Sequence, residues 1–331
     1  MTAHALDFSI ALSNNERTRP IIEGRHNPQG IRFLPTVVHP SEMFWRQLKF
    51  AEFDVSEMSI SSLCIAVSKG DTRFVAIPIY TARMFFHTRI MVRRDSGIRT
   101  PADLKGKRIG VPEYQQTSAI WSRGVLQHEF GVHARDIEWH MERLPDKSHG
   151  GSTGFKAPDG VRITQIPLST NIGEMLMKGE LDGALLYLNE PNLVDRSTAD
   201  ISEICKPLFD DQIAESARYF QKTGVYPINH TMVIKRDLHE KYPWAAVNIY
   251  HAFMAAKAEV ERSAEKTLKD YLACGLVEPP AAKMFRADPK AYGLRATRNV
   301  IDTIAQYVHE QGLTERRVRA DELFAPATLD L

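Results

Sequence analysis

Short strand-forming runs alternate with helical segments over the first 92 residues, and this alternation constrains the fold more than any other feature. Helices are expected to begin near His39 and to run from Ser61 to Gly70. Runs rich in β-branched and aromatic residues predict strands at 6–12, 31–38, 53–59, 74–80 and 88–92. This β-α-β order favours a largely parallel sheet with covering helices.

A second α/β unit begins near Asp95. It is expected to contain strands at 108–111, 137–141, 161–166 and 184–188, helices at about 118–130, 171–178 and 212–222, and an irregular loop at 143–160. After a strand at 231–234, the chain is expected to be mostly helical from 237 to 311. A chain of 331 residues exceeds one core of usual size, so the two units predict two lobes around a cleft.

Composition excludes several classes of protein. The net charge of +1 favours neither nucleic acid nor an anionic membrane as a partner, and no apolar run reaches the roughly 18 residues of a membrane span. The N-terminus lacks the basic and apolar regions of a secretory signal. Three distant cysteines form no zinc or redox motif and suit a reducing compartment, so we expect a cytoplasmic protein.

The segment 101–118 predicts an anion site. A short helix is expected to end at Gly106, a strand follows, and a polar loop enters a new helix near Thr117 or Ser118. The first N–H groups of a helix have no partners within it and lie at its positive dipole end, where a carboxylate or phosphate binds well. Three further polar loops also follow predicted strands, and ligands of open α/β sheets bind at such ends: 13–19, 59–62 and 188–192.

Ten segments in a consistent order resemble the 4,5-dihydroxyphthalate decarboxylase family. The run from Ala102 to Val111 resembles the start of the second lobe in type 2 periplasmic-binding-protein-like folds. The more specific segments are 17–19, 42–44, 52–59, 77–78, 83–87, 111–115 with Trp121, 179–184, 226–231, 239–244 and 322–326. Two loops depart from the usual family pattern, at 13–16 and 187–191, and both are expected to face the cleft, so the exact substrate stays open.

The resemblance implies a two-lobe α/β fold with mixed sheets flanked by helices and a ligand cleft between the lobes. Residues 1–92 and 226–331 would form the first lobe, and residues 93–225 would form an inserted second lobe. It also implies a cytoplasmic carboxy-lyase that removes CO2 from a hydroxylated aromatic carboxylate without an organic cofactor. The expected partner is therefore a small aromatic carboxylate, with no role for nucleic acid or membrane.

This chemistry needs groups that hold carboxylates, an acid near the ring carbon and an acceptor for a phenol hydrogen. Arg17 and Arg83 are candidate carboxylate clamps, and their alternative role is structural. His87 and His230 are candidate proton donors, because histidine titrates near neutrality, and either could instead make structural hydrogen bonds.

The predicted anion loop supplies the other candidates. Glu113 would accept the phenol hydrogen, and the neighbouring polar side chains would bind a carboxylate; the alternative is a simple helix cap with a packed tyrosine. Ser59 could donate to a ligand oxygen or cap the helix after it. The complete predicted substrate-binding set is Arg17, Arg83, Ser59, Tyr114, Gln115, Thr117, Ser118 and Asn189.

Two alternative functions stay open at this point. The chain could be a solute-binding protein without chemistry, or another lyase or hydrolase acting on an aromatic or heterocyclic acid. No metal motif is recognised, although a divalent ion held by distant histidines and carboxylates stays open. A homo-oligomer is compatible with the sequence, which carries no signature for or against it.

Overall fold

The computed structural model describes residues 5–278 and 288–331, and its strands form two mixed sheets. The first sheet has the order β2-β1-β3-β11-β4, with β11 antiparallel to both neighbours and the β1 pairs parallel. Its strands are β1 (Leu6–Leu12), β2 (Ile31–Val37), β3 (Val55–Ser59), β4 (Phe74–Arg83) and β11 (Ile228–Lys235).

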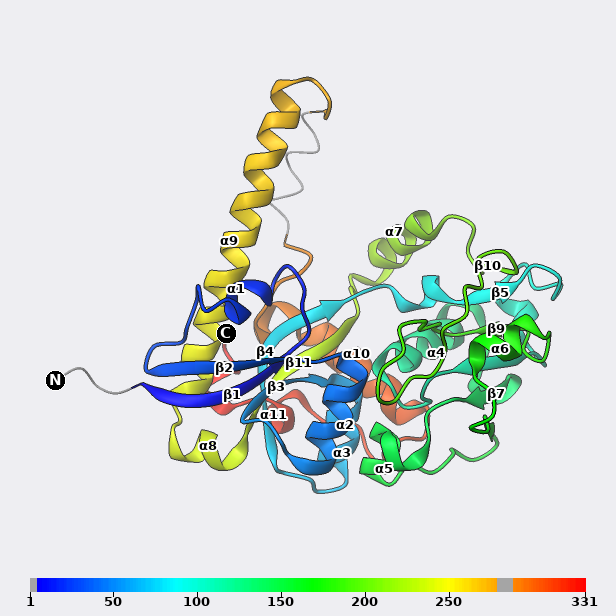
Figure 1. The fold of residues 1–331 in the computed structure, drawn as a ribbon, viewed down its shortest axis with the longest axis horizontal. Coiled ribbons are helices and arrows are strands. Elements are labelled where there is room, and N and C mark those ends of the chain that lie inside the picture. The colour runs from blue at the N-terminus through cyan, green and yellow to red at the C-terminus, as the bar shows by residue number, and fades with distance from the viewer. Residues whose placement is uncertain (1–4, 279–287) are drawn as a thin grey trace.

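The second sheet has the order β10-β5-β9-β6-β7-β8 and is parallel from β9 to β8. Its strands are β5 (Met91–Arg93), β6 (Arg108–Val111), β7 (Glu138–Met141), β8 (Arg162–Gln165), β9 (Gly183–Ala184) and β10 (Cys205–Pro207). The last of these was not expected from the sequence, since three residues around a proline give little strand pattern. The two sheets lie beside each other along the long axis of the molecule (Figure 1).

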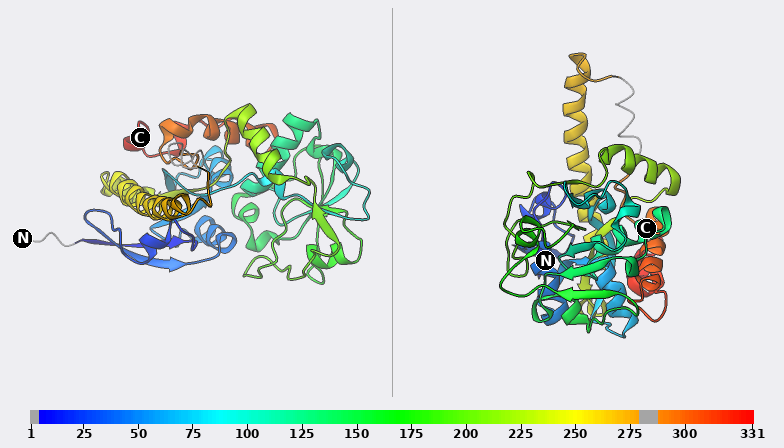
Figure 2. Two further views of the ribbon diagram at one scale, coloured as in Figure 1. Left: turned by 90° about the horizontal axis from the view of Figure 1, so that it is seen from above. Right: turned by 90° about the vertical axis from the view of Figure 1, so that its right-hand side faces the viewer.

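Helices cover both sheets. Those connected to the first sheet are α1 (Arg19–Ile22), α2 (Pro40–Phe50), α3 (Ile60–Ser68), α8 (Arg236–Lys241), α9 (Ala245–Ala273) and α11 (Ala320–Leu323). Those connected to the second are α4 (Thr117–Phe130), α5 (His149–Thr153), α6 (Ile172–Met177) and α7 (Gln212–Thr223). The distal half of α9 extends away from the rest of the molecule (Figures 1 and 2).

The chain crosses to the second sheet after β4 and returns to the first at β11. The boundaries after residues 92 and 225 stay a prediction. Helix α10 (Leu294–Glu310) packs against both α3 and α4 and so joins the two units. The close approach of α10 to α4 requires a glycine at position 124 of α4, because a Cβ atom there would lie 2.0 Å from the ring of Tyr307 in α10.

The largest apolar cluster is continuous across both sheets, from Ile10 in β1 to Trp139 in β7. A continuous core means that the elements on either side of the pocket described below are held by packing rather than by a flexible tether. None of the helices in 5–278 and 288–331 combines the length and the apolar character that a membrane crossing requires.

Candidate functional site

A pocket of about 220 Å³ lies where four helix N-termini approach the start of β11. Its walls come from elements on both sheets, and six of the sixteen lining side chains are apolar. The lining residues are His39, Pro40, Ser41, Phe44, Ser59, Met84, Phe86, Gln116, Thr117, Ser118, Arg143, His149, Leu186, Leu188, Asn229 and His230. Pockets for drug-sized ligands are larger, roughly 300–1,000 Å³, so this one suits a ligand built on a single ring.

His230 and Glu57 form a buried pair at one side of this pocket. His230 lies opposite Ser59 in the antiparallel β3–β11 ladder, and Glu57 is two residues before Ser59 on the same face of the strand. Glu57 is therefore the diagonal neighbour of His230 across the two strands, and His230 Nδ1 lies 2.9 Å from Glu57 Oε2. The carboxylate also accepts hydrogen bonds from Ser13 and from the Thr81 hydroxyl.

These contacts keep Glu57 ionised. Burial alone would raise the pKa of this carboxyl group, but the hydrogen bonds from His230, Ser13 and Thr81 outweigh burial and hold its pKa below its usual value. An ionised Glu57 accepts the hydrogen bond of Nδ1 and so orients the imidazole of His230. The Nε2 atom of His230 is 2.9 Å from the side-chain amide of Asn229, which also lines the pocket. When Nε2 carries a hydrogen, the oxygen of this amide can accept it. When Nε2 does not, the amide nitrogen can donate to it instead.

A cluster of hydroxyl groups forms a second side of the pocket, at the N-terminus of α4. Thr117 Oγ1 is 2.8 Å from Ser59 Oγ and 2.9 Å from Ser61 Oγ. The N-cap residue of α4, Gln116, makes no side-chain capping hydrogen bond. The first N–H groups of this helix are therefore not occupied by a capping side chain, and the predicted anion site here stays a prediction.

Arg143 lies at the base of the pocket, fully engaged by acidic partners. Its guanidinium bonds to both oxygens of Asp195, at 2.6 and 3.1 Å, and to Glu113 Oε2 at 3.0 Å. Burial disfavours the ionised form of Asp195, but the positive charge of Arg143 outweighs burial and lowers the pKa of Asp195 to about 2. The two carboxylates raise the pKa of Arg143 in turn, also against its burial. Because this charge is already compensated, Arg143 is not a free clamp for a substrate carboxylate.

The structure brings some of the predicted site residues to the pocket and places others elsewhere. Ser59, Thr117, Ser118 and His230 line it. Glu113 does not, because its two oxygens bond to Arg143 and to the backbone N–H groups at the start of α5.

The remaining predictions lie away from the pocket lining. Tyr114 is buried under the Arg123 guanidinium, and Gln115 lines neighbouring cavities. Asn189 is exposed in the loop after β9. The guanidinium of Arg83 donates to backbone carbonyls of Tyr226 and Ala291, so its role in the structure is to join β4 to later segments.

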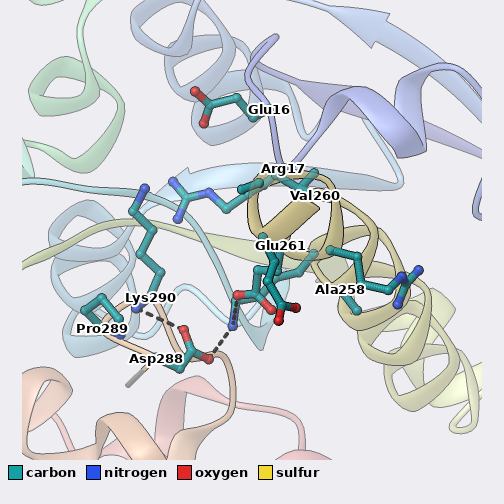
Figure 3. A pocket seen from close by; sticks show the side chains of 12 residues that line it. Glu16, Arg17, Ala258, Val260, Glu261, Asp288, Pro289 and Lys290 are labelled. Atoms are coloured by element: carbon teal, nitrogen blue, oxygen red, sulfur yellow. Dashed lines mark hydrogen bonds and ion pairs between the residues drawn. The ribbon is translucent and has the colours of Figure 1, made fainter. Parts of the chain in front are cut away.

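Arg17 lines a different and larger cavity, of about 440 Å³, against α9 (Figure 3). Its Nη2 atom donates to the Thr81 carbonyl, and its other two nitrogens have no partner among the described residues. Acidic and basic side chains are equally numerous around this cavity, and Lys257 is paired with Asp288 and Glu261. It contains no histidine, so the smaller pocket is the better candidate for proton transfer to a ring.

Comparison with known proteins decides the family. A 4,5-dihydroxyphthalate decarboxylase of Comamonas testosteroni is 33% identical over 328 residues, which cover 98% of each chain. The chain belongs to the 4,5-dihydroxyphthalate decarboxylase family. A protein of the same name from Pseudomonas putida is 36% identical over 180 residues, or 54% of this chain and 70% of that one. The resemblance predicted from the sequence is thereby confirmed.

The fold predicted for this 4,5-dihydroxyphthalate decarboxylase family member is also confirmed. A family model for the periplasmic substrate-binding protein of a phosphonate ABC transporter matches residues 30–152. The alkanesulfonate-binding protein SsuA of Xanthomonas axonopodis pv. citri superposes with a TM-score of 0.56 at 15% identity, over 98% of this chain and 99% of that one. The SsuA of Escherichia coli gives 0.52 at 13% identity, over 98% and 99%. These distant structures share the architecture alone.

Sequence reasoning missed three ionisable pocket residues of this family member, His39, Arg143 and His149, and also the amides Gln116 and Asn229. Arg143 is the second residue after β7, whose carboxyl end lies beside that of β6, so the rule used for the other loops could have found it. His149 begins α5 inside the segment expected to be an irregular loop. Among the described residues, no group of three or more potential ligands could hold a metal ion.

The surroundings of His87 lead to a prediction about how folding stability depends on pH, rather than about catalysis. It is fully buried against α7, with Nε2 3.1 Å from Glu215 and with aromatic neighbours at Phe85, Phe209 and Tyr219. Burial lowers its pKa to about 4, against the opposing influence of Glu215. Below pH 6.5 this histidine binds a proton in the unfolded chain but not in the folded chain. The free energy of unfolding therefore falls as the pH drops from 6.5 to 4.

We therefore expect His87→Gln to flatten this part of the stability profile, by on the order of 3 kcal/mol between pH 7 and pH 4. Glutamine can keep a hydrogen bond to Glu215 but does not titrate. Urea unfolding of both proteins at several pH values measures the difference. Parallel profiles for the two proteins would show that His87 does not stay neutral in the folded state.

Proposed function

We propose that this protein removes CO2 from a hydroxylated aromatic carboxylate, with 4,5-dihydroxyphthalate as the first candidate. One observation carries the proposal: in a chain of this family, the buried Glu57–His230 pair opens into a ring-sized pocket that also holds the N-terminus of α4. The pair supplies a proton donor and the helix supplies partners for a carboxylate. The cytoplasmic location predicted from the sequence fits the three free cysteines in the described chain.

His230 would protonate the ring carbon that bears the departing carboxylate. A hydroxyl para to that carbon donates electron density into the ring, so the carbon can accept a proton before the carbon–carbon bond breaks. The new C–H bond forms, the electrons of the C–CO2 bond return to the ring, and CO2 leaves. His230 then regains a proton from solvent. Glu57 accepts a hydrogen bond from Nδ1 and so holds the imidazole in one orientation during this transfer.

The apolar wall of the pocket supports an aromatic substrate. Phe44 packs edge-on to the His230 ring, at 4.7 Å between centroids, and Met84, Phe86, Leu186 and Leu188 complete the wall. A flat ring can lie on this surface while its polar groups reach α4 and His230. A ring seated on this wall would displace water from it, which would strengthen the electrostatic effect of each polar contact.

The proposal is tested with purified protein and 4,5-dihydroxyphthalate carrying ¹³C in its carboxylates. We expect one labelled CO2 for each substrate consumed and 3,4-dihydroxybenzoate as the organic product. Phthalate is the matched control, because it lacks the hydroxyl that activates the ring and should release no CO2. Recovery of unchanged 4,5-dihydroxyphthalate from a tight complex would instead favour a binding protein without chemistry.

A further inference from the structure

His149 is a deeply buried polar side chain of the pocket that the proposed mechanism does not use. It is 2% exposed, and its ring lines the pocket and packs edge-on against Phe44 at 5.5 Å between centroids. Phe44 thus contacts both His149 and His230. The Nε2 atom of His149 has no hydrogen-bond partner among the described residues. A buried donor or acceptor without a partner costs about 1–3 kcal/mol, so a ligand that satisfied it would regain that energy.

A chain of hydroxyl groups determines which nitrogen of His149 carries the hydrogen. Ser59 donates to Ser62 Oγ at 3.0 Å, and Ser62 Oγ lies 3.2 Å from His149 Nδ1. The Ser62 hydroxyl hydrogen is not used toward Ser59 and has no other acceptor among the described contacts, so we assign it to His149 Nδ1. A ring that accepts at Nδ1 and is neutral must carry its hydrogen on Nε2.

Burial keeps this ring neutral. It lowers the pKa of His149, against the nearby charge of Glu113, and the compensated Arg143 also disfavours a second positive charge. The Ser41 carbonyl lies close enough to favour a proton on the ring, yet it makes no hydrogen bond of normal geometry with Nε2. His149 therefore presents a neutral N–H donor that makes no hydrogen bond of normal geometry with the described residues.

Gln116 supplies a second unused donor in the same pocket. It is 6% exposed, and its Nε2 atom also lacks a partner within the described residues. Gln116 is the uncapped N-cap residue of α4, and the next residue, Thr117, is bonded to Ser59 at the start of the hydroxyl chain. Two buried donors and an uncapped helix N-terminus are thus connected around one space. Arg143 cannot take their place, since Glu113 and Asp195 already occupy it.

We propose that His149, fixed as the Nε2–H tautomer by Ser62, joins Gln116 and the N-terminus of α4 in binding the substrate carboxylate that is not removed. The inference rests on the proposal that this pocket accepts an aromatic carboxylate. It assigns Ser62 a positioning role, because Ser62 acts through His149 and not on the ligand. Glu113 also has a positioning role, since it holds the backbone N–H groups of His149 and Gly150.

Two isosteric substitutions test this subsite by calorimetric binding. The amide of His149→Asn can replace Nδ1 but does not reach the position of Nε2, whereas that of His149→Gln can. Phthalate is a suitable probe because it carries carboxylates but no activating hydroxyl, and catechol is its counterpart without a carboxylate. We expect His149→Asn to bind phthalate about 10- to 100-fold more weakly, with catechol binding unchanged and with His149→Gln closer to the wild type.

Ser62→Ala should weaken phthalate binding in the same direction, while Ser68→Ala, at the far end of α3, should not. Unchanged phthalate binding by His149→Asn, or equal losses for phthalate and catechol, would overturn the subsite. So would wild-type protein that does not bind phthalate. If phthalate binds as expected but 4,5-dihydroxyphthalate releases no CO2, the proposed function fails and the carboxylate subsite stands.

Discussion

His230→Asn is expected to lower kcat by about 10²–10⁴-fold while the protein stays folded. The asparagine amide can still donate to Glu57 from the place of Nδ1, so the buried carboxylate keeps its partner. What the variant lacks is a titratable group at the position of Nε2. Steady-state release of CO2 measures the loss, and thermal unfolding shows whether the fold is retained.

His251→Asn provides the matched control, because His251 is exposed on α9 and lines none of the cavities described here. It should retain wild-type activity. A His230→Asn variant that kept full activity would remove this residue from the mechanism. A parallel loss of activity and of folded protein would mean that the histidine acts through stability instead.

The largest loss of stability is expected from Arg143→Met, at about 3–5 kcal/mol. The substitution removes the cation from between Glu113 and Asp195, which are both almost fully buried. Two unpaired carboxylates would then have to be hydrated, protonated or exposed, and each of these costs free energy. Activity should fall too, since Asp195 ties the loop after β9 to the base of the pocket.

Urea unfolding of two further variants makes this test specific. Arg316→Met breaks an exposed pair with Glu322 and should cost no more than about 1 kcal/mol. Neutralising the acids as well, with Glu113→Gln and Asp195→Asn added to Arg143→Met, should recover most of the stability. If Arg143→Met cost no more than Arg316→Met, the three residues would not form a buried ionic network.

Local patterns were sufficient to predict most elements of the fold. The strand at 108–111 and the helix that follows lie where the sequence placed them, and so do the first strands and helices of the first sheet. Turn residues, helix starts and apolar periodicity are local properties, so a single sequence reveals them. The short strand β10 has no such pattern and depends on pairing with β5.

The candidate site was less predictable, because it depends on contacts between distant segments. Nothing local distinguishes Glu113, whose oxygens are taken by Arg143 and α5, from a free base in the same loop. Likewise, His87 and His230 are both histidines at strand ends, yet one is buried against α7 and the other faces the pocket. Only the sheet register brings His230 beside Glu57, 173 residues away in the chain.

The most direct test of the account is a crystal structure with bound 3,4-dihydroxybenzoate, the expected product. We predict that its ring lies against Phe44, with its carboxylate at α4 and His149. The ring carbon that has lost CO2 should then lie within about 3–3.5 Å of His230 Nε2. Product bound instead in the cavity lined by Arg17 and α9, away from His230, would contradict the account.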